Sequence, residues 1–323
     1  MKWLRRGMLM LLGLALGLGA AELYLRWKQP AKLALTGLEF RHGQNDRLHP
    51  KAGIYELDEE LGYAPVLGGP LMDERGAHHN EYADACAPGK RRVVFLGDSV
   101  TERGKLIEGV RLAYGDEDYE YWNLGVGGWA TEQEVRWHER HGRALDADQV
   151  VLTFHPNDWM STPICFLDEE GELVLHHPAR TIRWLPADWV RESWLVRLWV
   201  SRLMRDEPLM QTRLRAIDAA FEQLAAACAE DGSQLDVLLL PRLEPPEQWT
   251  PKEQHMRAEV KRLLDAHGID HVDLRRPLEI ALERGFDVRE RPDDWAHPSL
   301  AFGRVAGNWL EKRDFLIAAP AQE

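Results

Sequence analysis

Short apolar runs alternate with longer amphipathic segments along the last two thirds of the chain. Five runs are predicted to be strands: Arg92–Leu96, Tyr119–Leu124, Gln149–Phe154, Leu235–Leu240 and Ile269–Asp273. Five segments are predicted to be helices: Thr131–Gly142, Arg213–Asp231, Pro251–His267, Pro277–Arg284 and Phe302–Leu316. Continuous apolar strands between amphipathic helices are typical of a parallel sheet covered on both faces. The pattern therefore predicts an α/β fold of three layers, α/β/α, around a five-stranded parallel sheet.

The first 28 residues have the pattern of a membrane signal-anchor. Three basic residues precede the apolar stretch Gly7–Ala21, and this order favours a cytoplasmic N-terminus with the following chain outside. Glu22 interrupts the run, and Tyr24 and Trp27 follow as aromatic residues suited to a membrane interface. The run is short for a span, and Gly19-Ala20-Ala21 is typical of a signal-peptidase site. Cleavage and release to the periplasm is therefore the alternative to a single-pass inner-membrane anchor.

Residues 29–90 contain many turn signals and little periodicity. They are expected to form a stalk and an accessory segment, with a strand or two, packed on a main domain of residues 91–323. An insertion near residues 180–205 carries a tryptophan at every fifth position: Trp184, Trp189, Trp194 and Trp199. Such a stripe usually packs a helix onto its domain. The alternatives are a lid over an acyl pocket and a surface at the bilayer headgroups, where tryptophan is favoured.

The net charge and the cysteine count limit the binding partners and the disulfides that the chain can have. The chain of 323 residues has a formal net charge of −13, which argues against nucleic acid because its phosphates would be repelled. The same charge argues against broad electrostatic attachment to anionic lipid. An odd number of cysteines leaves at least one thiol outside any intramolecular disulfide. Cys228 is expected to be a buried helix thiol, whereas Cys86 and Cys165 are able to pair in an oxidising compartment.

A serine and a histidine at opposite ends of the main domain suggest nucleophilic catalysis. Ser99 directly follows a predicted strand, and Asp294 precedes His297 by three residues, a spacing that permits contact on one side of a helical turn. A serine hydroxyl needs a base to take its proton, and a histidine oriented by a carboxylate supplies one. Imidazole ordinarily titrates near pH ~6.5, which suits proton transfer at neutral pH. Taken singly, Ser99 is equally well explained as a helix N-cap, and the Asp–His pair as surface residues.

Two polar loops follow two other predicted strands. Asn123–Gly128 follows the strand that begins at Tyr119, and His155–Asp158 follows the next strand along the chain. An open parallel sheet binds ligands at the carboxyl ends of its strands. A bare glycine N–H and the Asn157 amide are donors of the kind that an oxyanion hole requires. The simpler alternatives are a turn glycine at Gly128 and an Asx-turn at Asn157.

In their order along the chain, these segments resemble the blocks of the SGNH (GDSL-type) hydrolases. Gly97-Asp98-Ser99-Val100 is similar to the nucleophile block, with valine in place of the commoner leucine. Asn123–Gly128 is similar to the glycine block, and Asn157-Asp158 to the asparagine block. Asp294 with His297 is similar to the closing Asp-x-x-His block, and this spacing selects Asp294 over the neighbouring Asp293.

Two further features bear on the resemblance. The family usually has glycine two residues before the asparagine of the third block, and this chain has His155 there. The departure puts the substrate type in question more than the reaction type. The sequence Glu-Leu-Tyr-Leu-Arg at residues 22–26, after the apolar run, is similar to membrane-anchored bacterial members of the family.

The resemblance implies a flavodoxin-like fold and ester hydrolysis through an acyl-serine intermediate. The residues that it assigns to catalysis are Ser99 as nucleophile, His297 as base and Asp294 as the group that orients His297. The donors that it assigns to the oxyanion hole are the Ser99 N–H, the Gly128 N–H and the Asn157 amide. Asp98 is expected to support the nucleophile turn by hydrogen bonds, outside the triad.

The expected substrate is an acyl ester, with an envelope carbohydrate or a lipid as the candidate alcohol. O-acyl transfer to or from an envelope polysaccharide would use the same acyl-enzyme. A non-catalytic binding or assembly factor would use the fold without the chemistry. The pairs His78-His79 and His176-His177 lack a carboxylate or cysteine at ligand spacing, and the glycine loop lacks the dinucleotide fingerprint. No metal and no cofactor are therefore expected.

Overall fold

The central sheet of the protein has five parallel strands in the order β10-β9-β6-β4-β5. The computed structural model describes residues 2–28, 45–159, 164–176, 193–204, 207–249 and 251–318. The five strands are β4 (Arg91–Gly97), β5 (Tyr119–Asn123), β6 (Gln149–Phe154), β9 (Gln234–Leu239) and β10 (Asp270–Asp273). The predicted five-stranded parallel sheet is confirmed, and every strand end lies within about one residue of its predicted place.

Helices cover both faces of this sheet, which gives the predicted three layers. One face packs against α4 (Lys105–Tyr114), α10 (Arg275–Glu283) and α11 (Leu300–Glu311). The other face packs against α5 (Thr131–Trp137), α8 (Glu207–Asp231) and α9 (Pro251–His267). Successive strand residues point to opposite faces, so β4 contributes Val93 and Phe95 to one core and Val94 and Leu96 to the other. Burying each such side chain stabilises the fold by roughly 1.5–3 kcal/mol.

The helix α4 is not among the predicted helices, although its sequence is amphipathic, with Leu106, Ile107 and Val110 buried. It carries Gly109 where it crosses α11, and a Cβ at this position would overlap the carbonyl oxygen of Gly303. Glycine is a weak helix former, but only glycine permits so close an approach of two helix backbones. The close crossing thus requires glycine at a position where it weakens the helix.

The ends of other helices differ from their predicted positions. Helix α8 begins at Glu207, and the predicted helix Thr131–Gly142 is α5 followed by a π-helical turn over His138–Gly142. Helix α11 ends at Glu311 instead of Leu316, and the chain turns at Asp314 with a φ of 50°. The apolar residues after this turn pack back into the core, so their pattern imitates a continuing helix.

The segment before β4 and the insertion after β6 add two small antiparallel sheets. β2 (Tyr55–Asp58) pairs with β3 (Gly62–Pro65). β1 (Asn45–Arg47) pairs with β8 (Leu173–His176), which also pairs with β7 (Ile164–Leu167). Residues distant in the sequence therefore share one sheet. Short 3₁₀ helices lie at Pro50–Ala52, Arg143–Leu145, Pro156–Trp159 and Pro246–Gln248.

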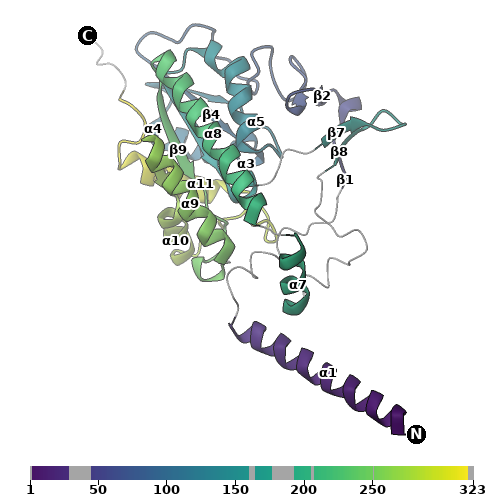
Figure 1. The fold of residues 1–323 in the computed structure, drawn as a ribbon. Coiled ribbons are helices and arrows are strands. Elements are labelled where there is room, and N and C mark those ends of the chain that lie inside the picture. Colours follow the sequence, from purple (N-terminus) through teal and green to yellow (C-terminus); the bar gives the residue numbers. More distant parts are fainter. Residues whose placement is uncertain are drawn as a thin grey trace.

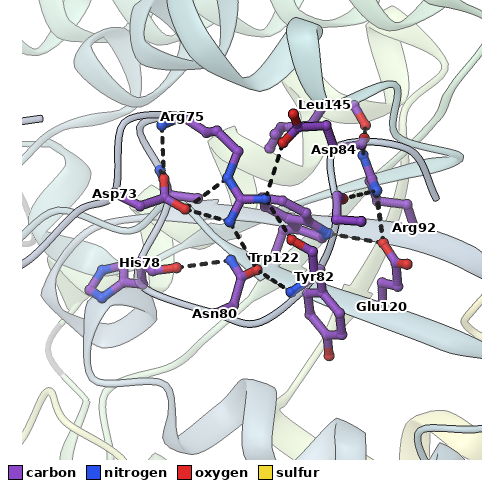
Figure 2. Close-up of polar contacts among 12 residues, drawn as sticks. Asp73, Arg75, His78, Asn80, Tyr82, Asp84, Arg92, Glu120, Trp122 and Leu145 are labelled. Carbon is purple, nitrogen blue, oxygen red and sulfur yellow. Dashed lines mark hydrogen bonds and ion pairs between the residues drawn. The ribbon is translucent and has the colours of Figure 1, made fainter. Parts of the chain in front are cut away.

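Residues 73–84 lie against β5, the edge strand of the main sheet, and Figure 2 shows their polar contacts. The guanidinium groups of Arg75 and Arg92 lie 4.3 and 4.8 Å from the Trp122 ring centre, where the π-system attracts a cation. Arg92 is fully buried and forms an ion pair with Glu120 at 2.9 Å, so its charge is compensated. The segment thus protects an otherwise open sheet edge. Residues 29–44 of the expected stalk lie outside the described residues.

Helix α1 (Lys2–Lys28) extends away from the domain (Figure 1) and is long and apolar enough to cross a membrane, by length and composition. Its Glu22 carboxylate accepts the backbone N–H groups of the first two residues of α7 (Trp194–Met204), at 3.0 and 2.8 Å. The Ser193 hydroxyl also donates to Glu22, at 3.0 Å. Because the first N–H groups of a helix have no partner within it, Glu22 caps α7 from a different helix.

Only part of the tryptophan-rich insertion lies within the described residues. Trp194 and Trp199 belong to α7, and the Arg197 guanidinium lies 4.8 Å from the centre of the Trp194 ring. Trp184 and Trp189 lie outside the described residues. The choice among a packing helix, a lid and a headgroup surface therefore stays a prediction.

The three cysteines are not cross-linked to one another. Cys228 is buried in α8, as the sequence predicts, and burial raises the pKa of its thiol to about 11. No disulfide joins Cys86 to Cys165, so the pairing considered for an oxidising compartment is not formed.

Candidate active site

Ser99 is the first residue of α3 (Ser99–Glu102), a short helix that begins where β4 ends. The strand ends at Gly97, whose φ is 152°, and a Cβ there would overlap the Thr101 hydroxyl. Glycine is thus required at this tight strand-to-helix turn. Asp98 closes the turn because its Oδ1 accepts, at 2.9 Å, the backbone N–H of the residue after Ser99. Asp98 therefore holds the turn that presents the Ser99 hydroxyl.

The side chains of Ser99, His297 and Asp294 form one hydrogen-bonded chain. His297 Nε2 lies 2.8 Å from Ser99 Oγ. His297 Nδ1 lies 2.9 Å from each oxygen of Asp294. A carboxylate only accepts hydrogen bonds, so Nδ1 carries the hydrogen and Nε2 is left as the acceptor beside the serine hydroxyl. In this arrangement the imidazole can take the serine proton.

Hydrogen bonds keep the Asp294 carboxylate ionised. Its side chain is only 6% exposed, and burial by itself would raise the pKa. The backbone N–H groups of His297 and Ala296 donate to Oδ1 at 3.1 and 3.2 Å, and together with the His297 ring they lower the pKa to about 2. Asp293, the competing carboxylate in the sequence, is exposed, and Asp294 is the one bonded to His297.

The loop Asn123–Gly128 is fastened from two sides. The Gly127 N–H donates to Glu102 Oε2, and the Tyr63 hydroxyl donates to the Gly127 carbonyl, both at 2.6 Å. Gly128 follows with a φ of 81°, and a Cβ at this position would lie 2.9 Å from the Tyr63 hydroxyl. Both the backbone conformation and the neighbouring tyrosine therefore require glycine at position 128.

Three residues that support this loop are missed by the sequence analysis: Tyr63, Glu102 and His78. His78 Nε2 donates to the Gly125 carbonyl at 2.8 Å, and burial lowers the pKa of His78, which favours the neutral ring. For His78 the sequence gives one signal, the His78-His79 pair, and this pair suggests a metal site instead of a loop contact. Tyr63 and Glu102 stand in no local motif, because their contacts join segments far apart in the chain.

The asparagine loop after β6 is tied to the nucleophile turn. Asn157 lies in the 3₁₀ helix Pro156–Trp159, and its Nδ2 donates to Asp98 Oδ2. His155, the departure from the family pattern, is completely buried, and its Nδ1 lies 2.6 Å from Asn157 Oδ1. The asparagine side chain is thus held from both ends of its amide.

Three N–H donors of these loops have no protein acceptor among the described residues. They are the Ser99 N–H, the Gly128 N–H and the second amide hydrogen of Asn157. The glycine loop is joined to the strand end because the Val126 N–H donates to the Gly97 carbonyl at 3.0 Å. Uncommitted donors near a nucleophile are what an oxyanion hole needs. Their role in catalysis stays a prediction.

Two carboxyl groups are buried close enough to Asp98 to be affected by its charge. They belong to Glu134 on α5 and to Asp158 in the asparagine loop. Burial raises the pKa of each well above its ordinary value. The negative charge of Asp98 adds to this for both groups, and that of Asp158 adds to it for Glu134. Asp158 Oδ2 accepts the His155 backbone N–H at 2.7 Å. Both effects, burial and the neighbouring negative charge, favour the neutral form of these two carboxyl groups.

Within the part of the chain that the structure describes, no group of three or more His, Cys, Asp or Glu side chains is placed to hold a metal ion. His79 Nε2 instead bonds to the Gly69 carbonyl at 2.8 Å. The His176 side chain and His177 lie outside the described set. The expectation that the site needs no metal or cofactor stays a prediction.

Comparison with known proteins gives similarity at the level of the fold. No protein-family model and no curated protein matches the chain in sequence. The chain is similar to Axe2, an acetylxylan esterase from Geobacillus stearothermophilus, at 15% identity and a TM-score of 0.45, over 70% of this chain and 95% of that chain. It is also similar to LAE5, an alpha/beta hydrolase enzyme from the metagenome of Lake Arreo, Spain, at 16% identity and a TM-score of 0.45, over 71% of this chain and 96% of that chain. Identities this low do not transfer either neighbour's activity to this chain.

Proposed function

We propose that this chain is a serine esterase of the SGNH type that hydrolyses an O-acyl ester. The observation that carries the proposal is the hydrogen-bonded chain from Asp294 through His297 to Ser99. Ser99 Oγ attacks the acyl carbon while His297 Nε2 takes its proton, and the alcohol leaves with that proton. Water then attacks the acyl-serine and gives its proton to His297. The tetrahedral intermediate formed by the water then breaks down. His297 returns the proton to Ser99 Oγ, which releases the carboxylic acid and restores the Ser99 hydroxyl.

The groups around the triad have complementary roles in this proposal. The Asp294 carboxylate, with its lowered pKa, stays negative and stabilises the imidazolium that forms at each step. The Ser99 N–H, the Gly128 N–H and the free Asn157 amide hydrogen bind the oxyanion. Each such donor is worth roughly 10²–10³ in turnover when it acts in the transition state.

We further propose that the reaction takes place on the outer side of the inner membrane, with α1 retained as an anchor. The basic residues before the apolar run support this orientation. The contact of Glu22 with the start of α7 supports retention, because it gives the end of the anchor helix a binding partner in the rest of the chain. The proposed substrate is an O-acyl ester of an envelope carbohydrate or lipid.

Covalent labelling tests the proposal directly. Full-length protein in detergent is treated with a fluorophosphonate probe and assayed on p-nitrophenyl esters from acetyl upward. Labelling is expected in the wild type and absent in Ser99→Ala, with kcat lowered by on the order of 10⁴–10⁶. A wild type with neither labelling nor turnover would support a binding factor. Diversion of the acyl group from water to an added oligosaccharide would support a transferase.

A further inference from the structure

His155 has an unusual environment for an ionisable residue. Its side chain is completely buried, immediately before the 3₁₀ turn that carries Asn157. Its Nδ1 lies 2.6 Å from Asn157 Oδ1, and its backbone N–H donates to Asp158 Oδ2 at 2.7 Å. Both the ring and the backbone of His155 are therefore held in place. The triad does not use this residue, so its burial beside a proposed oxyanion donor requires another explanation.

The hydrogen bonds around Asn157 determine which way its amide faces. Asp98 Oδ2 is an acceptor, so the amide group bonded to it is the NH₂. The amide oxygen consequently faces His155, whose Nδ1 must carry the hydrogen that this oxygen accepts. The opposite tautomer would set two lone pairs against each other. It would also bury an N–H at Nε2, which has no acceptor among the described residues.

The state of the His155 ring agrees with this assignment. Burial lowers the pKa of His155, so the ring is neutral at pH 7 and has one N–H. The ring also stacks on Trp295, with centroids 5.4 Å apart and planes 20° apart. The Arg242 guanidinium lies 4.6 Å from the centre of the same tryptophan ring. Because Trp295 belongs to the loop that carries Asp294 and His297, the orienting ring is fixed to the loop of the proposed base.

We propose that His155 is a positioning residue, which fixes the Asn157 amide so that one hydrogen bonds to Asp98 and the other faces the oxyanion. The inference rests on the proposed esterase function. Loss of the Nδ1 donor leaves the amide held on one side only, free to tilt or to turn its oxygen toward the developing negative charge. An oxyanion donor acts mainly in the transition state, so the effect falls on kcat and not on KM.

Two substitutions separate the hydrogen bond from the packing of the ring. His155→Phe keeps an aromatic ring against Trp295 but removes the donor, whereas His155→Asn keeps an N–H near the Nδ1 position but removes the stack. We expect His155→Phe to lower kcat of the full-length protein by roughly 10–100-fold, because Asp98 still holds one side of a donor worth roughly 10²–10³. KM should stay within about threefold, and His155→Asn should recover most of the lost kcat. Thermal melting checks that each variant is folded, and His155→Leu replaces His155→Phe if the latter does not fold.

A double-mutant cycle with Asn157→Ala completes the test. If His155 acts through the amide, a donor-free substitution at His155 should change kcat by less than about threefold once Asn157 is alanine. The proposal is overturned if the donor-free variant keeps wild-type kcat, or if His155→Asn is as slow as that variant. It is also overturned if the donor-free change slows Asn157→Ala as much as it slows wild type. A wild type without turnover or labelling would instead overturn the proposed function.

Discussion

Replacing Asp294 by asparagine tests the triad because it removes a charge and changes a tautomer while keeping the size of the side chain. In the wild type the carboxylate accepts from His297 Nδ1 at 2.9 Å. An asparagine there can offer its NH₂ to Nδ1, which moves the ring hydrogen to Nε2. The ring then cannot accept the Ser99 proton, and the known cost of such a wrong tautomer is on the order of 10⁴ in kcat.

The same change has a stability cost that follows from the lowered pKa. A shift of the Asp294 pKa from 3.8 to about 2 corresponds to roughly 2 kcal/mol in favour of the folded, ionised state. The side chain is 6% exposed, so solvent screening is weak. Because the pKa is lower in the folded state, this stabilisation is present above pH ~4 and is lost as the pH falls through about 2. In Asp294→Asn the amide oxygen still accepts the backbone N–H groups of the loop. The loss of folding stability should therefore be at most roughly 2 kcal/mol.

Turnover of p-nitrophenyl acetate and urea unfolding between pH 7 and pH 2.5 measure the two effects on the full-length protein in detergent. Asp293→Asn is the matched control, because it removes the neighbouring, exposed carboxylate. We expect Asp293→Asn to resemble wild type, and the stability gap between wild type and Asp294→Asn to shrink toward low pH. Activity of Asp294→Asn within tenfold of wild type, or a larger loss in Asp293→Asn, would refute the assignment.

Three other predictions follow from separate contacts. Asn157→Ala should lower kcat by roughly 10²–10³ with KM little changed in steady-state assays; an effect confined to KM would make Asn157 a substrate-binding residue. Gly109→Ala should lower the free energy of unfolding by about 1–3 kcal/mol, since its methyl group would overlap the Gly303 carbonyl, and an unchanged urea midpoint would contradict this packing. The full-length protein should stay in the membrane fraction with its N-terminus intact; a soluble product whose N-terminal sequence starts at Glu22 would show a cleaved signal peptide.

The layers of the fold could be predicted because the signals are local and strong. Strand β6 is apolar at Val150, Val151 and Leu152, and all three are fully buried between two layers of helices, so a continuous apolar run marks the strand. The antiparallel sheet of β1, β8 and β7 carries no such signal. Its strands are only three or four residues long and come from distant segments, so only the tertiary structure reveals their pairing.

The candidate site divides in a similar way. The sequence proposed Ser99, Asp294 and His297 because each stands in a short motif, and the structure brings all three into one hydrogen-bonded chain. It gave no indication of Tyr63 or Glu102, because one lies in the accessory segment and the other looks like an ordinary surface residue. What they do depends on a contact with Gly127 that exists only in the folded chain.

These contacts connect the segment before β4 to the candidate site. Tyr63 and His78 bond to carbonyls at Gly127 and Gly125, and each such hydrogen bond contributes about 1 kcal/mol net. The two contributions together are small compared with the stability of a domain, but both hydrogen bonds act on the same loop. Position 128 already has a backbone that only glycine adopts readily, and Tyr63 and Glu102 hold the residue before it from outside the loop. In the proposed function the motif therefore supplies the N–H donor of Gly128, and we expect the contacts from the accessory segment to fix the direction of that N–H.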